Sequence, residues 1–195
     1  FKLTKKIQDE KQLLKLRIIK NTSFNAHYDD DSDSFTVVGC GELRGYGTVN
    51  AYDHAQIYLE KGTVYAYDNS TVKIYHSESS AFYNNAKGHV VSDGNVLIYN
   101  NASCEIEGIV HAIFKDQSSG KCSDTSIATF SDKSRGELLD YAIGRSFDKS
   151  SLTMRNNSVL QLFDKSSVVA YDSATIRNFK VYNTGIVLHD NAKYV

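Results

Sequence analysis

The stretch that decides the fold is VYAYDNSTVKIYHSESSAFYNN, residues 64–85. It places Tyr67, Tyr75 and Tyr83 at an interval of eight residues, each followed by two polar residues. A helix repeats its faces every 3.6 residues and a strand every two, so neither alone has this period. A strand of about five residues followed by a turn of about three residues does. The stretch therefore predicts a short strand-turn unit that is copied in tandem.

The period extends well beyond this stretch, over roughly residues 47–110 and 148–192. In the second block Asn156, Asp164 and Asp172 again lie eight residues apart. Apolar residues that share the positions before the turn are expected to point inward, because alternate residues of a strand face the same side. The predicted core of the first block consists of Ile74, Phe82, Val90, Ile98 and Ile106, with Val96 and Cys104 beside them.

One unit of this kind cannot bury its own apolar side, so units must stack and share a core. The Asp/Asn pair turns the chain, since these side chains bond their own backbone and Asn tolerates left-handed conformations. The sequence therefore predicts an all-β protein, a parallel β-helix (β-solenoid) built on an eight-residue repeat. Two or three units could form one coil, and Asn69, Asn85 and Asn101, which recur at sixteen residues, favour two.

Two segments depart from the repeat. Residues 3–20 place Leu3, Ile7, Leu14 and Ile18 on one helical stripe, which predicts an amphipathic N-terminal helix. Such a helix would cap the open end of the core or bind a partner. Residues 111–147 lose the register, and a capping box at Ser134 predicts a loop with a short helix there. The predicted organisation is an N-terminal helix or cap (1–22), a first solenoid block (23–110), an interruption (111–147) and a second solenoid block (148–195).

Composition gives no electrostatic reason to expect nucleic acid, because 22 basic residues face 23 acidic ones. No apolar run reaches the length of a membrane span, and the basic N-terminus has no signal-peptide core. That absence favours the cytoplasm of a host cell over an extracellular location. The chain opens on Phe1, which suggests a fragment or a processed form. Cys104 is expected to be a buried thiol, although a bridge to Cys122 stays open.

Little in the sequence indicates chemistry. Residues 27–34, HYDDDSDS, resemble the start of a calcium loop, but Thr36 stands where the turn glycine belongs, so a solvated loop is favoured. Asp68, His76 and Asp164 fall at turn positions, which explains them without catalysis. The sequence therefore predicts no enzyme, no metal site and no cofactor.

The units VYAYDNSTVKIY and VVAYDSATIRNF resemble the "AYDNATV"-type octapeptide arrays of bacterial, phage and mobile-element proteins, mostly of unassigned function. The best matches are Ala51–Asp53, Ala66–Asn69 and Ala170–Ala174, within repeat segments that cover somewhat over half of the chain. The resemblance implies a β-solenoid and says almost nothing about activity. The array here is degenerate and interrupted, which suggests a specialised member rather than a spacer.

Three functions are hypotheses at this point. The first is a non-catalytic protein-binding module, which in a phage or mobile element would bind and inhibit a host factor. Such a module could also form a homo-oligomer. The second is a structural or adhesive module that binds glycans, and the third and least favoured is a carbohydrate-active enzyme. A repeat face offers the same chemistry every eight residues, so the interruption is expected to carry the specific contact. The candidate binding residues are Lys115, Lys121, Arg135, Glu137, Asp140 and Tyr141.

The aromatic position of the repeat is expected to point outward and to form ladders along the edge of the solenoid. These rings would either protect the turns by stacking or offer a surface to a ligand. The ladder residues are Tyr67, Tyr75, Tyr83, Tyr99, Phe163, Tyr171 and Phe179.

Overall fold

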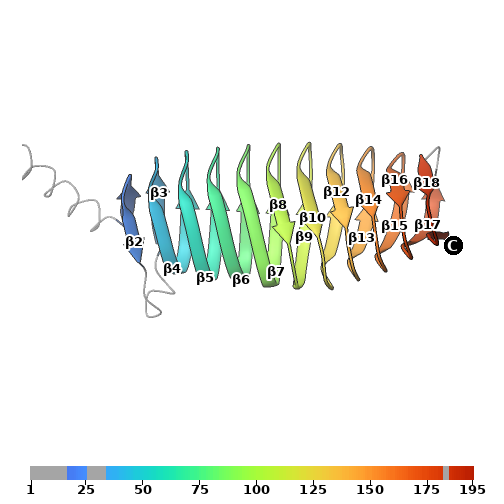
Figure 1. The fold of residues 1–195 in the computed structure, drawn as a ribbon. Coiled ribbons are helices and arrows are strands. Elements are labelled where there is room, and N and C mark those ends of the chain that lie inside the picture. Colours follow the sequence, from blue (N-terminus) through green and yellow to red (C-terminus); the bar gives the residue numbers. More distant parts are fainter. Residues whose placement is uncertain (1–16, 26–33, 182–184) are drawn as a thin grey trace, which may run out of the picture.

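The protein is a β-solenoid in which strands of successive coils pair in parallel along one axis (Figure 1). The computed structural model describes residues 17–25, 34–181 and 185–195, with the side chains of 178–181 outside that description. The register aligns Ser103 with Ser119, and Ser119 with Arg135, so one coil takes sixteen residues. The predicted fold class is confirmed. The coils between β7 and β16 contain two octads each, whereas some earlier coils are shorter, as where Gln56 aligns with Thr71.

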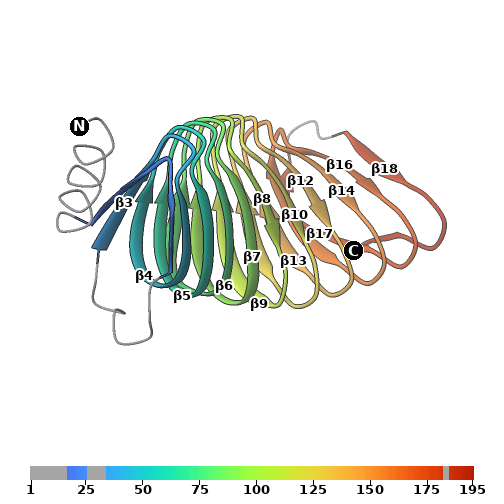
Figure 2. The same ribbon diagram turned by 60° about the vertical axis from the view of Figure 1, so that its left-hand side comes forward.

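Each coil contributes one strand segment to each of two faces, which lie on opposite sides of the flattened coils in Figure 2. Strands β4 to β7 are long and run from the first face into the second, whereas later coils have two separate strands. The first face consists of β2 (Ser23–Asn25), the first parts of β4 (Glu42–Ala51), β5 (Gln56–Ala66), β6 (Thr71–Phe82) and β7 (Lys87–Ile98), then β8 (Ser103–Ile106), β10 (Ser119–Cys122), β12 (Arg135–Leu138), β14 (Ser151–Met154), β16 (Ser167–Ala170) and β18 (Ile186–Leu188).

The second face begins with β1 (Ile18–Lys20) and β3 (Ser34–Val38), which pair directly. The second parts of β4 to β7 come next. The strands that complete this face are β9 (Ile109–Phe114), β11 (Ile127–Phe130), β13 (Ile143–Ser146), β15 (Val159–Asp164), β17 (Thr175–Val181) and β19 (Lys193–Tyr194).

Two rows of tight turns connect the faces, and most have an Asp or Asn in the left-handed region. We call corner A the row that comes after the second face; Asp116, Asp132 and Asp148 have φ values of 59°, 60° and 57° there. Several backbone N–H groups in this row donate to the carboxylate one coil further on: Asp116 N lies 3.2 Å from Asp132 Oδ2, and Asp132 N lies 3.1 Å from Asp148 Oδ2. The turn residues of the repeat are therefore selected for both backbone conformation and coil-to-coil bonding. Corner B, which comes after the first face, has the same type of turn at Asp124, Asp140, Asn156, Asp172 and Asp190.

The core lies between the two faces and agrees with the predicted inward positions. Ile74, Phe82, Val90 and Ile98 are 0% exposed, and Ile106, Val96 and Cys104 are at most 2% exposed. The small residue of most octads is buried inside a corner, as at Ala86. This part of the prediction is confirmed.

The predicted interruption at 111–147 is wrong. This segment forms β9 to β13, which pair in the same sixteen-residue register as the coils on either side. The residues from Ser134 to Gly144, predicted to be a short helix, are β12, a turn and the start of β13. The hydrophobic pattern is hidden here because Gly120, Gly136 and Gly144 occupy inward positions.

Neighbouring side chains of unusual size fill the space above these glycines. A Cβ atom on Gly120 would lie 2.1 Å from Phe114 Cε1, and one on Gly136 would lie 2.3 Å from Phe130 Cε1. Both phenylalanines are fully buried, and their rings stack with centroids 4.6 Å apart. Each ring reaches across corner A to the residue six positions later. The side-chain volume that fills the core is therefore shared between two positions six residues apart, and it is not constant at each single position.

The N-terminal prediction is partly wrong and partly outside the described residues. Residues 1–16, most of the expected cap helix, lie outside them, as do residues 27–33 of the acidic segment. Ile18–Lys20, expected to be the end of that helix, form β1 and pair with β3. Ile19 is buried in the core at 1% exposure, so burial of this β-branched residue favours a strand here.

Candidate protein-binding face

Four isoleucines lie exposed on the second face, in three consecutive coils. Ile109 is 68% exposed, Ile113 37%, Ile127 38% and Ile143 43%. Branched aliphatic side chains are among those most often buried in proteins, so four exposed neighbours are unusual. Together with partners in adjacent coils they form what we call the apolar stripe: Leu97, Ile109, Ile113, Ile127, Tyr141, Ile143 and Val159.

The parallel register places these side chains next to one another. Leu97 aligns with Ile113, Ile127 aligns with Ile143, and Ile143 aligns with Val159. Aligned residues on adjacent strands are about 4.8 Å apart. Backbone pairing holds the strands on both sides, so the stripe is a rigid surface.

The strands under the stripe differ in charge: Asp93 on β7 aligns with Ile109, whereas β9, β11 and β13 carry no acidic side chain at their outward positions. The outward positions of β9, β11 and β13 hold His111, Thr129 and Arg145 besides the isoleucines. Arg145 donates through Nε to Gln161 Oε1 at 3.2 Å, which holds its guanidinium on this face. Arg177 lies further along, on β17, and is exposed. The second face is therefore apolar in its centre and basic toward the C-terminal coils.

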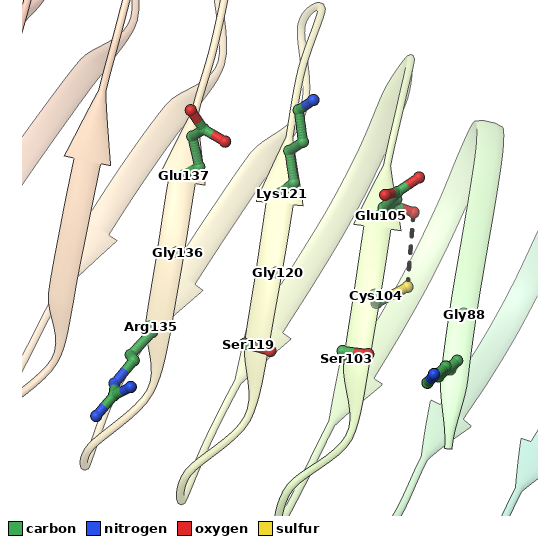
Figure 3. Close-up of a pocket in the computed structure, with 11 residues that line it drawn as sticks. Gly88, Ser103, Cys104, Glu105, Ser119, Gly120, Lys121, Arg135, Gly136 and Glu137 are labelled. Carbon is green, nitrogen blue, oxygen red and sulfur yellow. Dashed lines mark hydrogen bonds between the residues drawn. The ribbon is translucent and has the colours of Figure 1, made fainter. Parts of the chain in front are cut away.

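The first face carries a shallow trough of about 510 Å³ over β7, β8, β10 and β12, with charged residues along its sides (Figure 3). Its floor is low because the outward residues Ser103 and Ser119 are small and Gly120 and Gly136 lie beneath. Figure 3 shows Lys121 and Glu137 extending from neighbouring strands at one end of the trough. Glu105, Lys121 and Glu137 align across three coils, so cationic and anionic groups alternate. The trough therefore does not favour a ligand of one particular charge.

The predicted binding residues do not form one cluster. Lys121, Arg135 and Glu137 line the trough on the first face. Asp140 and Tyr141 lie in corner B, where Tyr141 is 64% exposed at the edge of the apolar stripe. Lys115 lies in corner A, next to Asp116.

The exposed isoleucines were missed by the sequence prediction. Ile127 and Ile143 fall within residues 111–147, where the octad register is not recognisable from single positions. With that register continued they occupy outward positions, where Thr, Lys or Asn stand in other units. An apolar residue at an outward position was the available signal.

The predicted aromatic ladder divides between the two corners, since the period of each corner is about sixteen residues. Tyr52, Tyr67, Tyr83 and Tyr99 stack in corner A with centroids 4.9, 5.0 and 5.3 Å apart. Burial, with the neighbouring tyrosines as a smaller cause, raises the pKa of Tyr67 and of Tyr83. The faces of the inner rings are covered by other rings, which favours a structural role for this stack.

The other predicted ladder residues have separate environments. Phe163 stacks on Phe147 in corner A at 4.6 Å. Tyr171 lies in corner B, stacked on His189 at 4.7 Å with Arg155 above its other side at 4.5 Å. Tyr75 lies at the end of the first face beside Lys73, and the side chain of Phe179 is outside the described residues.

We expect Tyr83→Ala to lower stability without affecting the binding of a partner. The change removes two stacked contacts at 5.0 and 5.3 Å, each contributing about 0.5–1.5 kcal/mol. Tyr75→Ala is the matched control, because Tyr75 is 40% exposed, and its loss should be smaller. Thermal unfolding measures both effects. A Tyr83→Ala protein with an unchanged melting temperature but lost binding would assign the stack to a ligand instead.

All three cysteines are free thiols, and two lie in the core. Burial raises the pKa of the Cys104 thiol well above its usual value and also raises the pKa of the Cys122 thiol. A thiol that cannot ionise is a poor nucleophile. The alternative of a bridge between Cys104 and Cys122 is not what the structure contains.

One thiol of the three is therefore expected to react in the native protein. Treatment with a thiol-specific disulfide reagent at pH 8 should label Cys40, which is exposed, and leave Cys104 and Cys122 unlabelled until denaturant is added. Mass spectrometry of the digested protein identifies the labelled sites. Rapid native labelling of Cys104 would contradict the burial of that thiol.

Two histidine-carboxylate pairs lie near corner B in the first coils. His76 Nδ1 is 2.8 Å from Asp93 Oδ1, and His89 Nε2 is 3.2 Å from Glu107 Oε1. The first pair is more than half exposed, so water competes with it. Within the described residues, no group of three or more His, Cys, Asp or Glu could hold a metal ion, and no helix has the length and apolar character of a membrane span.

No family model, no curated protein and no solved structure matches this chain.

Proposed function

We propose that this chain is a non-catalytic protein-binding module and that the apolar stripe on its second face is the contact surface. The exposure of Ile109, Ile113, Ile127 and Ile143 in three consecutive coils carries this proposal. Contiguous exposed apolar patches on monomeric proteins are commonly sites of protein association. Tyr141 at the edge of the stripe belongs to a residue type that is enriched at interfaces.

The scaffold supports this role because it presents the stripe without a cost in ordering. Backbone hydrogen bonds to the coils on both sides hold β9, β11 and β13 in place. A surface that is rigid before binding loses little conformational entropy on association. In a phage or mobile-element setting, which the octapeptide resemblance suggests, the partner would be a host protein whose own surface the stripe occludes.

Glycan binding, the other hypothesis, is less well supported. A sugar ring stacks on a free aromatic face, whereas Tyr67 and Tyr83 are each covered on both sides by neighbouring rings. The stripe itself is aliphatic for most of its length.

The proposal is tested by placing a charge in the stripe. Ile143→Asp should reduce capture of partner protein from a lysate of the source cells at least tenfold, because the carboxylate is desolvated on binding. Thr153→Asp is the matched control, since Thr153 points outward from β14 on the first face. Quantitative mass spectrometry compares the proteins retained by the parent and by both variants.

Both variants should retain the circular dichroism of the parent, because each substitution lies at an outward position. A set of captured proteins that Ile143→Asp leaves unchanged would contradict the proposal. So would a loss that Thr153→Asp causes equally.

A further inference from the structure

The apolar stripe has a direction, which limits what can lie on it. Leu97 and Ile113 align in adjacent coils, and Ile127, Ile143 and Val159 align in the next three. Ile127 lies two residues before Thr129, the residue aligned with Ile113, so the stripe steps sideways once along its length. It crosses five coils in succession, a length of about 19 Å along the solenoid axis at the usual strand spacing.

The spacing of the stripe matches a helix better than a strand. Apolar residues on one side of a helix recur every three or four residues, an advance of about 4.5–6 Å. Side chains on one side of a strand recur every about 6.6–6.8 Å. The coils repeat every about 4.8 Å, so a helix along the axis stays in step with them, whereas a strand loses register after two contacts. A length of about 19 Å corresponds to about 13 helical residues.

The charge of the second face indicates which charge the helix should carry on the side that points toward β13 and β17. Arg145 and Arg177 border the C-terminal part of the stripe, and the outward positions of β9, β11 and β13 hold no carboxylate. An acidic flank on the helix would complement these groups. Residues 1–16 of this chain, FKLTKKIQDEKQLLKL, are rich in lysine and do not have that charge. A second copy would bring the same basic face against itself.

We propose that the apolar stripe seats an amphipathic helix of a partner protein, about four turns long, lying along the solenoid axis with acidic residues facing Arg145 and Arg177. This inference rests on the proposed function and names the chemistry of the partner. The apolar residues of the partner helix contact Leu97, Ile127 and Val159 in turn, and Tyr141 borders the helix on the side near corner B. Helices that dock in this manner are recognised through anchors at i, i+3 or i+4, and i+7.

Synthetic peptides test the helix and its charge directly on the full chain. The probe is an 18-residue helical peptide with leucines at i, i+4, i+7 and i+11 and glutamates along one flank. One control peptide replaces those glutamates with lysine, and another has the same composition in a strictly alternating order. Fluorescence anisotropy should show the glutamate helix binding at least tenfold more tightly than either control. The double variant Arg145→Glu with Arg177→Glu should prefer the lysine helix.

Photoreactive groups at the two ends of the peptide test its direction. The expected crosslinks from one end lie in β7 or β9 and those from the other in β15. Equal affinity for both charges, tightest binding of the alternating peptide, absence of binding, or crosslinks confined to one coil would each overturn the inference. So would sedimentation showing that the chain dimerises and that Ile143→Asp makes it monomeric.

The two proposals can fail separately. If Ile143→Asp abolishes capture of a partner but no helical peptide binds, the stripe is the contact surface and only the helix is wrong. If capture is indifferent to Ile143→Asp, the proposed function itself is wrong.

Discussion

Phe130→Ser is expected to destabilise the protein by about 3–5 kcal/mol, the usual loss when a buried phenylalanine is truncated. Phe130 is fully buried, and its ring stacks on Phe114 at 4.6 Å. Gly136→Leu alone should also be destabilising, by about 1–3 kcal/mol or more, because a Cβ atom there would lie 2.3 Å from Phe130 Cε1.

The two changes together should cost much less than their sum. One coil further on, Ser146 and Leu152 occupy the equivalent positions and are both buried. Ser146 Oγ lies 2.7 Å from Ser150 Oγ, whereas Ser134, the equivalent of Ser150, has a buried Oγ with no hydrogen-bond partner. The hydroxyl that Phe130→Ser introduces can supply that partner, and the leucine fills the space of the ring.

Urea unfolding of the parent, both single variants and the double variant gives the coupling between the two positions. Far-UV circular dichroism and tyrosine fluorescence are suitable signals, since the chain has 13 Tyr and no Trp. A favourable coupling of about 2 kcal/mol or more is expected. Simple additivity would mean that the volumes at positions 130 and 136 are independent.

Gly94→Ala is the second substitution with a large expected effect, about 3 kcal/mol or more of lost stability. Gly94 lies in corner B with a φ of 132°, a conformation that other residues rarely adopt. A Cβ atom would also lie 1.9 Å from the backbone oxygen of Ser77, which cannot rotate away. Backbone strain and overlap therefore act together.

Ser92→Gly in the same corner is the matched control and should have the opposite sign. Ser92 has a φ of 82° with a side chain present, so removing that side chain relieves strain. The gain is expected to be about 0.5 kcal/mol after the entropy cost of a glycine in the unfolded chain. Thermal and urea unfolding compare the two variants. A Gly94→Ala protein as stable as the parent would show that the coils can shift apart locally.

The regular part of the fold could be predicted because each octad repeats one physical requirement at one position. Residues such as Ile74 and Ile98 are apolar where they are inward, and Asp or Asn stands where the backbone is left-handed. The coils of residues 111–147 could not be recognised in the same way. There the inward volume is shared between positions six residues apart, as in Phe114 and Gly120, so a pattern of single positions appears broken.

The candidate site was harder to predict than the fold for the same reason. Without the register, Ile127 and Ile143 have no assigned direction, and the charged residues around Arg135 stand out as the distinctive feature of the segment. If residues 115–133 had formed the expected loop, a short linker could have replaced them without loss of stability. These residues instead include β10 and β11, so their removal would open the core.

Because two octads complete one coil, the number of octads inserted or lost decides which side of the molecule every later residue faces. Removing sixteen residues from the coils around β11 to β14 would keep every later residue on its present face and shorten the solenoid by one coil. Removing eight would turn all later residues to the opposite side, so that strands now on the first face would continue the second, and the reverse. The number of octads gained or lost therefore limits how this chain can evolve by duplication. An even number changes the length of the solenoid, and an odd number changes which residues each face presents.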